Sequence, residues 1–544
     1  MSFGFIHKLK HRAAQLTYGN VLYDWSLGGS VPNAFVSVPT DAWPGDMERG
    51  RWLCEGTFIV AGEPLQIHGE CWEPAGINDI WLNYIHGFEW LRDLRAVGGD
   101  QGRQAARAYI DNWIAHYAGW HEKIWSPDIA GKRVANWIAL YEFFGASGDL
   151  DFQERYFESV SKQARHLSRA LPENLFGLPL LHGIKGLAFA GLALPKSENY
   201  LEQALDLLQV ETEKQILSDG GHVSRSPAQL VEALRIYIDI RNGLLHAGYP
   251  VPEQIEHNID RMTQAVRFFR YADKKLALFN GAQEGNINWL DSVLAKANGR
   301  GRILRGLPHT GFERLSQGRS VLMVDVAPPA AYPYEKQAHA APMAFEFIYG
   351  KERMFVSCGS HPLDTQWQDV LRGTAAHNMA EIDHRNICEV LQDGHIGRRP
   401  KNVISTREEN DGVSLLEMCH DGYGPVNGIT HRRRLFMADQ GHDLRGEESF
   451  NCSVGLGKEA DIAIRFHLHP KVQVSLIRDG QEALLRLGGG AGWRFIHSAG
   501  LLTLENSVYL GEGAQPRKTK QLVINGRMDS DHAKIKWALR REGR

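Results

Sequence analysis

The sequence has no apolar run of the kind that exports or anchors a protein. Its first twelve residues are basic and carry no apolar core of signal-peptide length, and no later stretch is long enough to span a bilayer. Taken alone, these two absences predict a cytoplasmic protein. Strong charge of one sign is also missing, since the net charge is −3 at pH 7. That value argues against an electrostatic grip on nucleic acid, although it allows a local basic cleft.

Closely paired cysteines are missing as well. The six cysteines are widely spaced and form no Cys-x-x-Cys pair: Cys54, Cys71, Cys358, Cys388, Cys419 and Cys452. This spacing does not support a zinc ribbon and is typical of free, buried thiols. The helical segments described below follow no fixed repeat period, which argues against a solenoid of identical units.

The composition is that of an ordinary globular protein. Of the 544 residues, 43% are hydrophobic and 23% are charged. A chain of this length is expected to form two or three domains. From Tyr18 to Gly76 it is rich in Gly, Pro and Trp. We therefore expect residues 1–76 to form an extended arm packed on helices, with a short hairpin at Thr57–Glu63.

Helical periodicity begins at Asn78, a good N-cap. Apolar residues from Trp81 to Leu94 keep the i, i+3, i+4, i+7 spacing of one amphipathic helix, which Gly98-Gly99 would end. Further amphipathic segments lie near 101–117, 130–144, 151–169, 175–193, 198–217, 227–245 and 252–272. Short breaks separate them, and such a series is typical of a ring of antiparallel helical hairpins.

From about Arg302 the apolar period changes from 3.6 to 2. Strands are predicted at 320–326, 343–349, 414–418, 433–437, 461–468 and 493–496. Strands without intervening helices predict an antiparallel sandwich or barrel. We expect a helical domain over 77–300 and an antiparallel domain over 301–544, with the change of structure within about ten residues of Gly301.

Three chemically versatile side chains flank neighbouring predicted strands. His339 precedes the strand Met343–Tyr349, whose alternation predicts a half-buried strand. Cys358 ends the next strand, and His377-Asn378 opens a third. Loops at the ends of strands can gather such groups into one site.

These residues carry a resemblance to a known family. The His-Ala at 339–340, the glycine at 359 and the Arg-Gly-Thr-Ala-Ala-His-Asn run at 372–378 resemble the heparinase II/III-like polysaccharide lyases. The resemblance implies an N-terminal (α/α) toroid followed by a C-terminal antiparallel β-sandwich, with a site in the cleft between them. It implies β-elimination of a uronic-acid polysaccharide, and it favours the bacterial cell envelope or periplasm over the cytoplasm.

β-Elimination requires a base, a donor that neutralises the uronate carboxylate, and an acid that protonates the leaving oxygen. A family signature on a toroid helix is matched here by residues 218–227, which include Asp219-Gly220-Gly221 and Ser226-Pro227. Where the family has its catalytic Tyr, this chain has Gln229, and an amide cannot serve as a base. A turn at 219–221 and a helix start at Ser226-Pro227 also explain much of the match structurally.

On the preceding inner helix the resemblance points to His182 and Lys185, which would share one helix face. His182 is thus a candidate catalytic residue, and the resemblance implies that His182 and Arg225 bind the uronate carboxyl. Lys185, where the family often has Glu, could pair with the same carboxylate. The alternative is a buried imidazole beside a solvated ammonium group.

In the antiparallel domain the family often has His-x-His-Ala, and this chain has Gln337 in place of the first His and His339 in place of the second. His377 is kept, and the family's metal-binding Asp is replaced near Ser357-Cys358. His339, Cys358 and His377 could still bind zinc, since zinc takes imidazole nitrogen and thiolate readily. Hydrogen-bonded structural histidines are the alternative. No other cofactor is expected.

His377 and Tyr423 are the remaining candidates for proton transfer. An imidazole needs little change of pKa to act as a base near pH 7, and Tyr423 follows a Gly-containing turn from which it could replace the missing Tyr. Gln229, Gln337 and Asn378 are further candidates for binding substrate through their amides.

Three functions remain open. The first is a lyase that cleaves an acidic polysaccharide or oligosaccharide. The second, favoured by Gln229 and Gln337, is a non-catalytic glycan-binding or envelope-biogenesis protein on the same fold. The third is a glycoside hydrolase, for which Glu284 and Asp325 are the available carboxylates. A lyase makes a conjugated unsaturated uronate, a hydrolase makes reducing ends only, and a binding protein makes neither.

Overall fold

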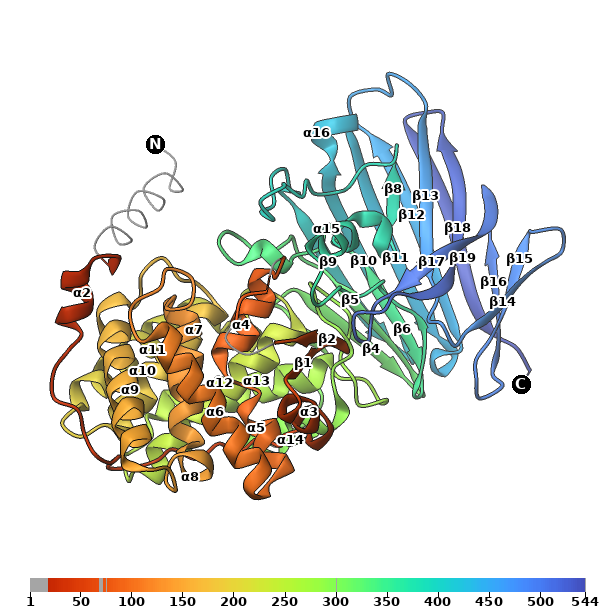
Figure 1. Cartoon of the computed structure of the whole chain (residues 1–544). Helices are drawn as coiled ribbons and strands as arrows, with labels where there is room; N and C mark the ends of the chain where they lie inside the picture. Colours follow the sequence, from red (N-terminus) through yellow and green to blue (C-terminus); the bar gives the residue numbers. More distant parts are fainter. Residues whose placement is uncertain (1–17, 68–71, 75, 300, 544) are drawn as a thin grey trace. The chain divides into compact units, whose positions relative to one another are not determined.

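The computed structural model describes residues 18–67, 72–74, 76–299 and 301–543. Helices dominate up to Ala297 and strands dominate from Gly306 onward (Figure 1). The change of structure predicted near residue 300 is therefore confirmed. By their contacts, the described residues form two compact units. The first, which we call the helical unit, comprises the chain up to Gln215, Glu232–Ile259 and Ala295–Ala297. The second, which we call the sheet unit, comprises Ile216–Val231, Asp260–Leu294 and the chain from Asn298.

The helical unit contains the predicted series of helices and one small hairpin. Its elements are α2 (Val21–Ser26), α3 (Met47–Cys54), β1 (Thr57–Val60), β2 (Glu63–Gln66), α4 (Asp79–Gly87), α5 (Leu91–Val97), α6 (Gly99–Tyr117), α7 (Pro127–Ala139), α8 (Tyr141–Phe144), α9 (Leu150–Ala170), α10 (Leu178–Ala193) and α11 (Glu198–Gln215). Three helices contribute residues to both units: α12 (Pro227–His246), α13 (Glu253–Phe269) and α14 (Ile287–Ala297). The predicted hairpin is confirmed as β1 and β2, which pair antiparallel.

The helix predicted to run from Asn78 to Gly98 is two helices. Asn78 caps α4 as predicted, since its side chain accepts from the backbone N–H groups of Ile80 and Trp81. However, Phe88 has a φ of 58° and lies in the left-handed region, which ends α4. Phe88 is fully buried. The apolar period continued across this break, so periodicity alone could not detect it.

Helix α10 is the buried centre of the helical unit. Every residue from Leu180 to Ala193 is buried, as expected for a helix that is apolar on all sides. Glycines allow α10 to approach α7 closely: a Cβ on Gly186 would lie 2.4 Å from the Cα of Gly131, and a Cβ on Gly131 would lie 2.6 Å from the Cα of Gly183. This close packing holds the polar residues of α10 at fixed positions among its neighbours.

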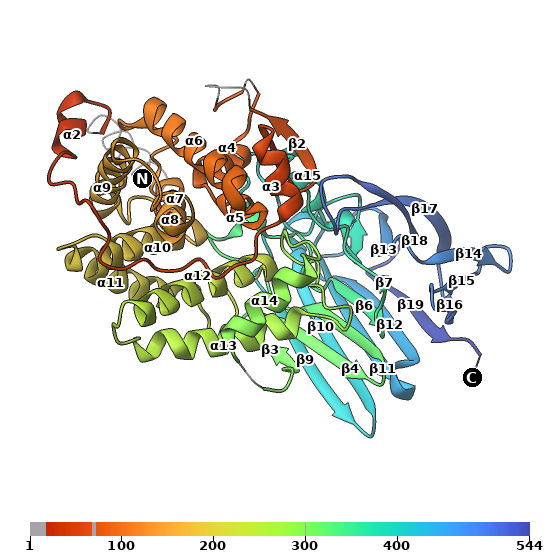
Figure 2. The same ribbon diagram turned by 60° about the horizontal axis from the view of Figure 1, so that its bottom comes forward.

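The sheet unit consists of three antiparallel sheets (Figure 2). The five-stranded sheet has β3 (Gly306–Leu307), β4 (Phe312–Gln317), β5 (Ser320–Asp325), β6 (Phe345–Tyr349) and β7 (Glu352–Phe355). The four-stranded sheet has β8 (Ala380–Ile382), β13 (Ala460–His467), β17 (Leu501–Tyr509) and β18 (Arg517–Met528). The eight-stranded sheet has β9 (Val403–Asn410), β10 (Val413–Tyr423), β11 (Ile429–Ala438), β12 (Asp443–Cys452), β14 (Gln473–Ile477), β15 (Glu482–Arg486), β16 (Gly492–His497) and β19 (His532–Arg541).

The three sheets share one apolar core. Phe345 of β6 and Phe466 of β13 both contact Trp537 of β19, with ring centroids 5.7 Å and 4.9 Å apart. An isolated bridge between Phe355 and Leu468 links the five-stranded sheet to the chain that follows β13. The predicted helical part and the following antiparallel sheets are thus confirmed, while the closed ring of helical hairpins stays a prediction.

Strand β6 differs from its prediction. All five of its residues are buried, whereas the alternation predicted a half-buried strand. The polar residue in it, Glu346, is buried because it has partners: it accepts from Tyr271 Oη at 3.0 Å and from the backbone N–H of Ser357 at 3.0 Å. A satisfied carboxylate can occupy a core position, so the polar residue did not mark an exposed face.

Candidate functional site

In the helical unit, one imidazole–carboxylate contact and one ion pair connect α10 to α12. His182 Nε2 lies 3.3 Å from Glu232 Oε1, and Lys185 Nζ lies 2.8 Å from Asp239 Oδ2. The two α10 residues share a face, as their spacing predicted. On a helix that is otherwise apolar and buried, each polar group must find a partner, and the acidic residues of α12 provide it.

These pairs belong to a longer chain of alternating charges within the helical unit, which we call the helical charge network. Arg235 NH2 contacts both Glu232 and Glu89, the latter at 2.7 Å. Glu89 also contacts Arg92, at 3.6 Å. Arg92 and Arg95 in turn contact Asp41, at 2.8 Å and 2.9 Å. Each charged side chain contacts at least one opposite charge, which offsets the cost of removing it from water.

The helical charge network reaches the surface at two carboxylates. The side chains of Glu89 and Glu232 are each 26% exposed, while Arg235 is only 2% exposed. Burial raises the pKa of Glu89, but Arg235, Lys132 and Arg92 outweigh it and hold that pKa well below its usual range. Burial lowers the pKa of His182 well below its usual value, and the positive charge of Lys132 adds to this effect. The network therefore presents the ionised carboxylate of Glu89 together with a neutral imidazole, that of His182.

The predicted role of Lys185 does not fit this arrangement. Lys185 is 4% exposed, and its ammonium group is already paired with Asp239. Asp239 also accepts from the indole Nε1–H of Trp43 at 2.6 Å. Lys185 is therefore neither solvated nor free to pair with a substrate carboxylate.

In the sheet unit, His339 and His377 lie together as the resemblance implied. Their rings stack at a centroid distance of 4.3 Å and an angle of 29°. The backbone N–H of Gly281 donates to His339 Nε2 at 2.9 Å, and the side chain of Asn280 accepts from the backbone N–H of His339 at 3.0 Å. The two histidines thus lie against the loop at 280–281.

Cys358 does not join the two histidines. Its Sγ lies 3.4 Å from His467 Nδ1, whereas Ser357 Oγ lies 3.1 Å from His377 Nδ1. Side chains of successive residues in extended backbone point to opposite sides, so only one of these neighbours can face His377. Burial raises the pKa of the Cys358 thiol to about 12, which keeps it protonated.

This donor set does not fit a zinc ion. A stacked pair of imidazoles does not direct its lone pairs at one point, and one His339 nitrogen is already occupied by the Gly281 N–H. Among the described residues, no group of three or more His, Cys, Asp or Glu side chains could hold a metal ion. We therefore derive no step through zinc.

His377 is also poorly placed to act as a base. It is 0% exposed, and burial lowers its pKa to about 3, with His467 contributing and the Leu371 backbone opposing. An imidazole with so low a pKa accepts a proton weakly at neutral pH. Its contact with Ser357 and its stacking on His339 are those of a structural residue.

Arg225 is fully used inside the sheet unit. Its guanidinium group donates to four backbone carbonyls, those of Thr310, Gly311, Ala327 and Pro328, and to Asp325. These acceptors occupy all five N–H donors of the group. The predicted binding of a uronate by Arg225 therefore does not fit. The pairing also removes Asp325 from the carboxylates available to a glycoside hydrolase.

The Asp-Gly-Gly signature has a structural role of the same kind. Asp219 accepts from the backbone N–H groups of His309 and Thr310 at 2.7 Å and 2.8 Å, and from the Thr310 hydroxyl at 2.7 Å. Gly220 has a φ of 83°, and a Cβ there would lie 2.1 Å from the carbonyl oxygen of Arg261. Through these hydrogen bonds, Asp219 and Arg225 hold Ile216–Val231 against the first strands of the sheet unit.

Tyr423 and Asn378 are structural as well. The hydroxyl of Tyr423 donates to the Ala380 carbonyl at 2.9 Å, and its side chain is 0% exposed. Burial raises its pKa well above the usual value. Asn378 donates to the carbonyls of Phe345 and Val356 and accepts from the backbone N–H of His467. Neither residue fits its predicted role in catalysis or substrate binding.

Gln229 and Gln337 are the predicted site residues that remain partly exposed. Gln229 lies in the first turn of α12. Gln337 ends the short 3₁₀ helix Glu335–Gln337, and its amide covers Gly281, where a Cβ would lie 1.9 Å from Gln337 Oε1. Both amides can donate to and accept from sugar hydroxyls, but neither can transfer a proton.

The residues that the sequence did not single out are Glu89, Glu232 and Arg235. Two signals were present. Glu232 and Arg235 are three residues apart on a predicted helix, which places them on one face. Glu232 also lies three residues after Gln229. The pairing with Glu89, which is 146 residues from Arg235, had no local signal.

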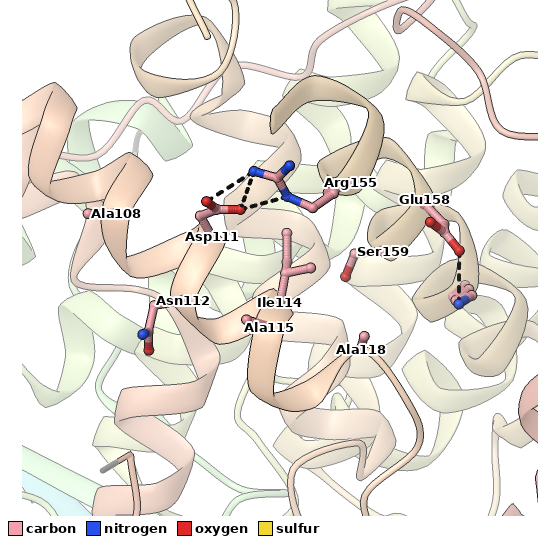
Figure 3. Close-up of a pocket in the computed structure, with 10 residues that line it drawn as sticks. Ala108, Asp111, Asn112, Ile114, Ala115, Ala118, Arg155, Glu158 and Ser159 are labelled. Carbon is pink, nitrogen blue, oxygen red and sulfur yellow. Dashed lines mark hydrogen bonds and ion pairs between the residues drawn. The ribbon is translucent and has the colours of Figure 1, made fainter. Parts of the chain in front are cut away.

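A surface groove of the helical unit contains none of the predicted site residues. It lies between α6 and α9, has a volume of about 690 Å³, and has Ala108, Ala115 and Ala118 among its lining residues (Figure 3). Its charged residues pair with one another, Arg155 with Asp111 at 2.9 Å and Lys162 with Glu158 at 3.0 Å. The groove therefore offers no unpaired charge for a ligand among the residues that line it.

Comparison with known proteins gives two family matches that together cover most of the chain. The family model described as Heparinase II/III N-terminus matches residues 73–298, and the model described as Heparinase II/III-like, C-terminal matches residues 299–538. No helix in the described part of the chain has the length and apolar character needed to cross a membrane.

Similar proteins include one that is related over nearly the whole chain. FtsZ-localized protein C from Caulobacter vibrioides is 30% identical over 538 residues, which covers 93% of this chain and 90% of that protein. A heparin-sulfate lyase from Pedobacter heparinus is 21% identical over 373 residues, which covers 59% of this chain and 54% of the lyase. A crystal structure of heparinase III superimposes with a TM-score of 0.78 at 15% identity, covering 98% of this chain and 91% of that one, and shows the shared fold.

Proposed function

The chain belongs to the heparinase II/III-like family, and from that membership we propose that it is a member without lyase chemistry, which binds an acidic glycan and works at the site of cell division. The family and the fold are those of polysaccharide lyases. The proposal keeps the fold as a binding scaffold and assigns no cleavage to it.

The observation that carries the proposal is the state of the proton-transfer positions. Where the resemblance implies the family's catalytic Tyr, this chain has the amide of Gln229. The two substitutes that the sequence offered, His377 and Tyr423, are both 0% exposed and hydrogen-bonded within the sheet unit. Elimination needs a group that can reach the sugar and take its proton, and none of these three side chains meets both requirements.

Binding without cleavage remains within reach of the same positions. Gln229 and Gln337 are partly exposed amides, and amides hydrogen-bond to sugar hydroxyls as donors and acceptors. We expect Gln229→Ala and Gln337→Ala each to weaken glycan binding by about tenfold, which corresponds to roughly 1.4 kcal/mol. The matched control is Gln481→Ala, a glutamine in the β14–β15 turn, which should leave binding unchanged.

The association with cell division is supported by the relative named FtsZ-localized protein C, which is similar over nearly the whole chain. Two measurements test it. A fluorescent fusion should gather at the FtsZ ring and disperse when FtsZ is depleted. Purified protein should sediment with FtsZ polymers, and a fusion that stays evenly distributed would contradict this part of the proposal.

Protease protection tests in which compartment the protein lies. The family resemblance favours the periplasm, whereas an association with FtsZ favours the cytoplasmic alternative. Protease added to spheroplasts should leave the protein intact if it is cytoplasmic and digest it if it is periplasmic.

A lyase is the second candidate, and one observation favours it. Glu232 is partly exposed and paired with His182, so a carboxylate and an imidazole are available together in the helical unit. If the protein cleaves a uronate polysaccharide, Glu232→Gln should reduce the rate by about 10²-fold or more, the usual contribution of general acid–base catalysis. The control is Glu256→Gln, a carboxylate of the same unit that is 47% exposed and lies outside the helical charge network.

A further inference from the structure

The sheet unit contains a small cavity lined mostly by charged groups. Its volume is about 240 Å³. Five cationic and four anionic side chains line it, together with His469: Lys275, Lys351, Arg353, Lys471 and Arg517, and Asp273, Glu284, Glu352 and Glu512. Apart from Glu284, which was a candidate carboxylate for a glycoside hydrolase, none of these residues was predicted to act on a glycan, and the cavity has no role in the function proposed above.

The carboxylate at the centre of the cavity wall is fully engaged. Glu284 is 2% exposed and accepts from Lys275 Nζ and from the hydroxyl of Tyr509. Arg353 and His469 lie 3.7 Å and 3.8 Å from its Oε1. Burial raises the pKa of Glu284, but the nearby His469 and the charge of Arg353 outweigh this and hold the pKa far below its usual range. Glu284 is thus a fixed negative charge with its own partners.

The other three carboxylates are engaged in the same way. Asp273 accepts from Arg353 Nε at 2.7 Å and from the backbone N–H of Lys275 at 3.0 Å. Glu512 contacts Lys275 and Arg517. Glu352 accepts from the backbone N–H of Gly489 at 2.7 Å. Glu284, Asp273 and Glu512 are thus paired with cations, whereas Glu352 is held by a backbone N–H.

Two lysines and one nitrogen of a guanidinium group remain without an internal partner. Lys351, in the turn between β6 and β7, and Lys471, after β13, form no ion pair with any residue that the structure describes. Arg353 is 4% exposed, and its NH1 is buried with no hydrogen-bond partner in the described chain. A buried guanidinium nitrogen without an acceptor is costly, and an anion in the cavity would reduce that cost.

We propose that this cavity binds a small oxyanion, namely the carboxylate, sulfate or phosphate group of a single sugar residue or metabolite. Lys351 and Lys471 would contact the anion at the rim, and Arg353 would support it from the wall. The volume lies just below the roughly 300–1,000 Å³ of pockets that take drug-sized ligands, so it suits one sugar residue better than an extended chain. Fixed cations pre-arranged around a cavity bind oxyanions at little cost in reorganisation.

The test is titration of the full-length protein with glucuronate, inorganic phosphate and sulfate in separate calorimetric experiments. The unmodified protein should bind at least one anion saturably. The anion that binds most tightly shows whether the cavity prefers a carboxylate, a phosphate or a sulfate group. The double variant Lys351→Ala/Lys471→Ala should bind it about tenfold or more weakly, because each exposed cation contributes up to about 1 kcal/mol. Binding should also weaken as salt is raised.

The matched control is Lys401→Ala/Lys458→Ala, which removes two exposed lysines of the sheet unit that do not line the cavity. It should bind like the unmodified protein. Lysine acetylation read by mass spectrometry gives a second measurement: the anion should protect Lys351 and Lys471 but not the control lysines. Equal affinity of the two double variants, equal labelling with and without anion, or no saturable binding of any of the three anions would overturn the proposal.

Discussion

Two charge networks, one in each unit, differ in whether they reach the surface. In the helical unit, the helical charge network runs through buried arginines to the partly exposed carboxylates Glu89 and Glu232. In the sheet unit, Glu448, Arg433 and His431 form a network in which every side chain is 0% exposed. Glu448 accepts from Arg433, from His431 at 2.7 Å and from Trp537 Nε1 at 3.1 Å.

This difference shows where ligand chemistry can occur in the molecule. A network whose side chains are all buried, which we call sealed, stabilises the fold but cannot contact a ligand. A network with partly exposed members can contact one. The residues with the strongest family resemblance, such as His377 and Arg225, lie among the sealed groups. Resemblance therefore located the fold in this chain more reliably than it located a working site.

The largest expected effect comes from breaking the sealed network. Glu448→Gln removes the charge that balances Arg433 and leaves that guanidinium group buried in the core. We expect a loss of about 3–5 kcal/mol in the free energy of unfolding, the usual result of removing one partner of a buried ion pair. Glu232→Gln in the helical unit should cost only about 1 kcal/mol, because Glu232 is 26% exposed and Glu89 still pairs with Arg235. Urea denaturation of both variants measures the difference, and equal costs would remove the distinction between the two units.

The second effect tests whether Arg225 is a structural residue. Arg225→Ala leaves four backbone carbonyls and the buried Asp325 without their donor, and it should cost about 3 kcal/mol or more. Arg434→Ala is the control, since Arg434 is 42% exposed and its ion pairs should contribute no more than about 1 kcal/mol. Thermal unfolding measures both. A folded Arg225→Ala protein of unchanged stability that has lost glycan binding would instead support a role in binding.

The third effect is on the pH dependence of stability. Burial lowers the pKa of His377 to about 3 and that of His467 to about 4, whereas an unfolded histidine titrates near about 6.5. The unfolded state therefore binds more protons in this window, and stability is lost as pH falls from about 6.5 toward 4, by up to about 1.4 kcal/mol per pH unit for each histidine. Urea midpoints at pH 7, 6 and 5 should show this decline.

A matched pair of variants identifies the source of that decline. His377→Gln should reduce the slope by about one proton, and His532→Gln, which removes an exposed histidine, should leave it unchanged. If both variants keep the slope of the unmodified protein, His377 is not neutral in the folded state.

Much of the fold could be predicted because its signals are local. The change of apolar period near residue 300, the cap at Asn78 and the hairpin of β1 and β2 each depend on residues a few positions apart. The break at Phe88 was missed because its apolar side chain fits the helical pattern while its backbone is left-handed. Burial of β6 was missed because the partners of Glu346 come from other segments.

The candidate site was less predictable because the partners that decide it are distant in sequence. Lys185 pairs with Asp239, 54 residues away, and Arg225 pairs with Asp325, 100 residues away. A sequence shows that a cationic side chain is present, but not whether it is already paired with a carboxylate of the same protein. Likewise, the sequence could not show that Ser357 rather than Cys358 contacts His377, because the position along the extended backbone and not the residue type decides which side chain faces it.

The central claim is that the fold has kept glycan binding without β-elimination. The most direct measurement is ultraviolet absorbance of the purified protein incubated with a panel of acidic polysaccharides, with a heparin-sulfate lyase as the positive control. The account predicts no rise in the absorbance of a conjugated unsaturated uronate with any polysaccharide of the panel. A rise in absorbance that persists in His377→Ala and Tyr423→Phe and disappears in Glu232→Gln would contradict the account and establish a lyase that uses the helical charge network.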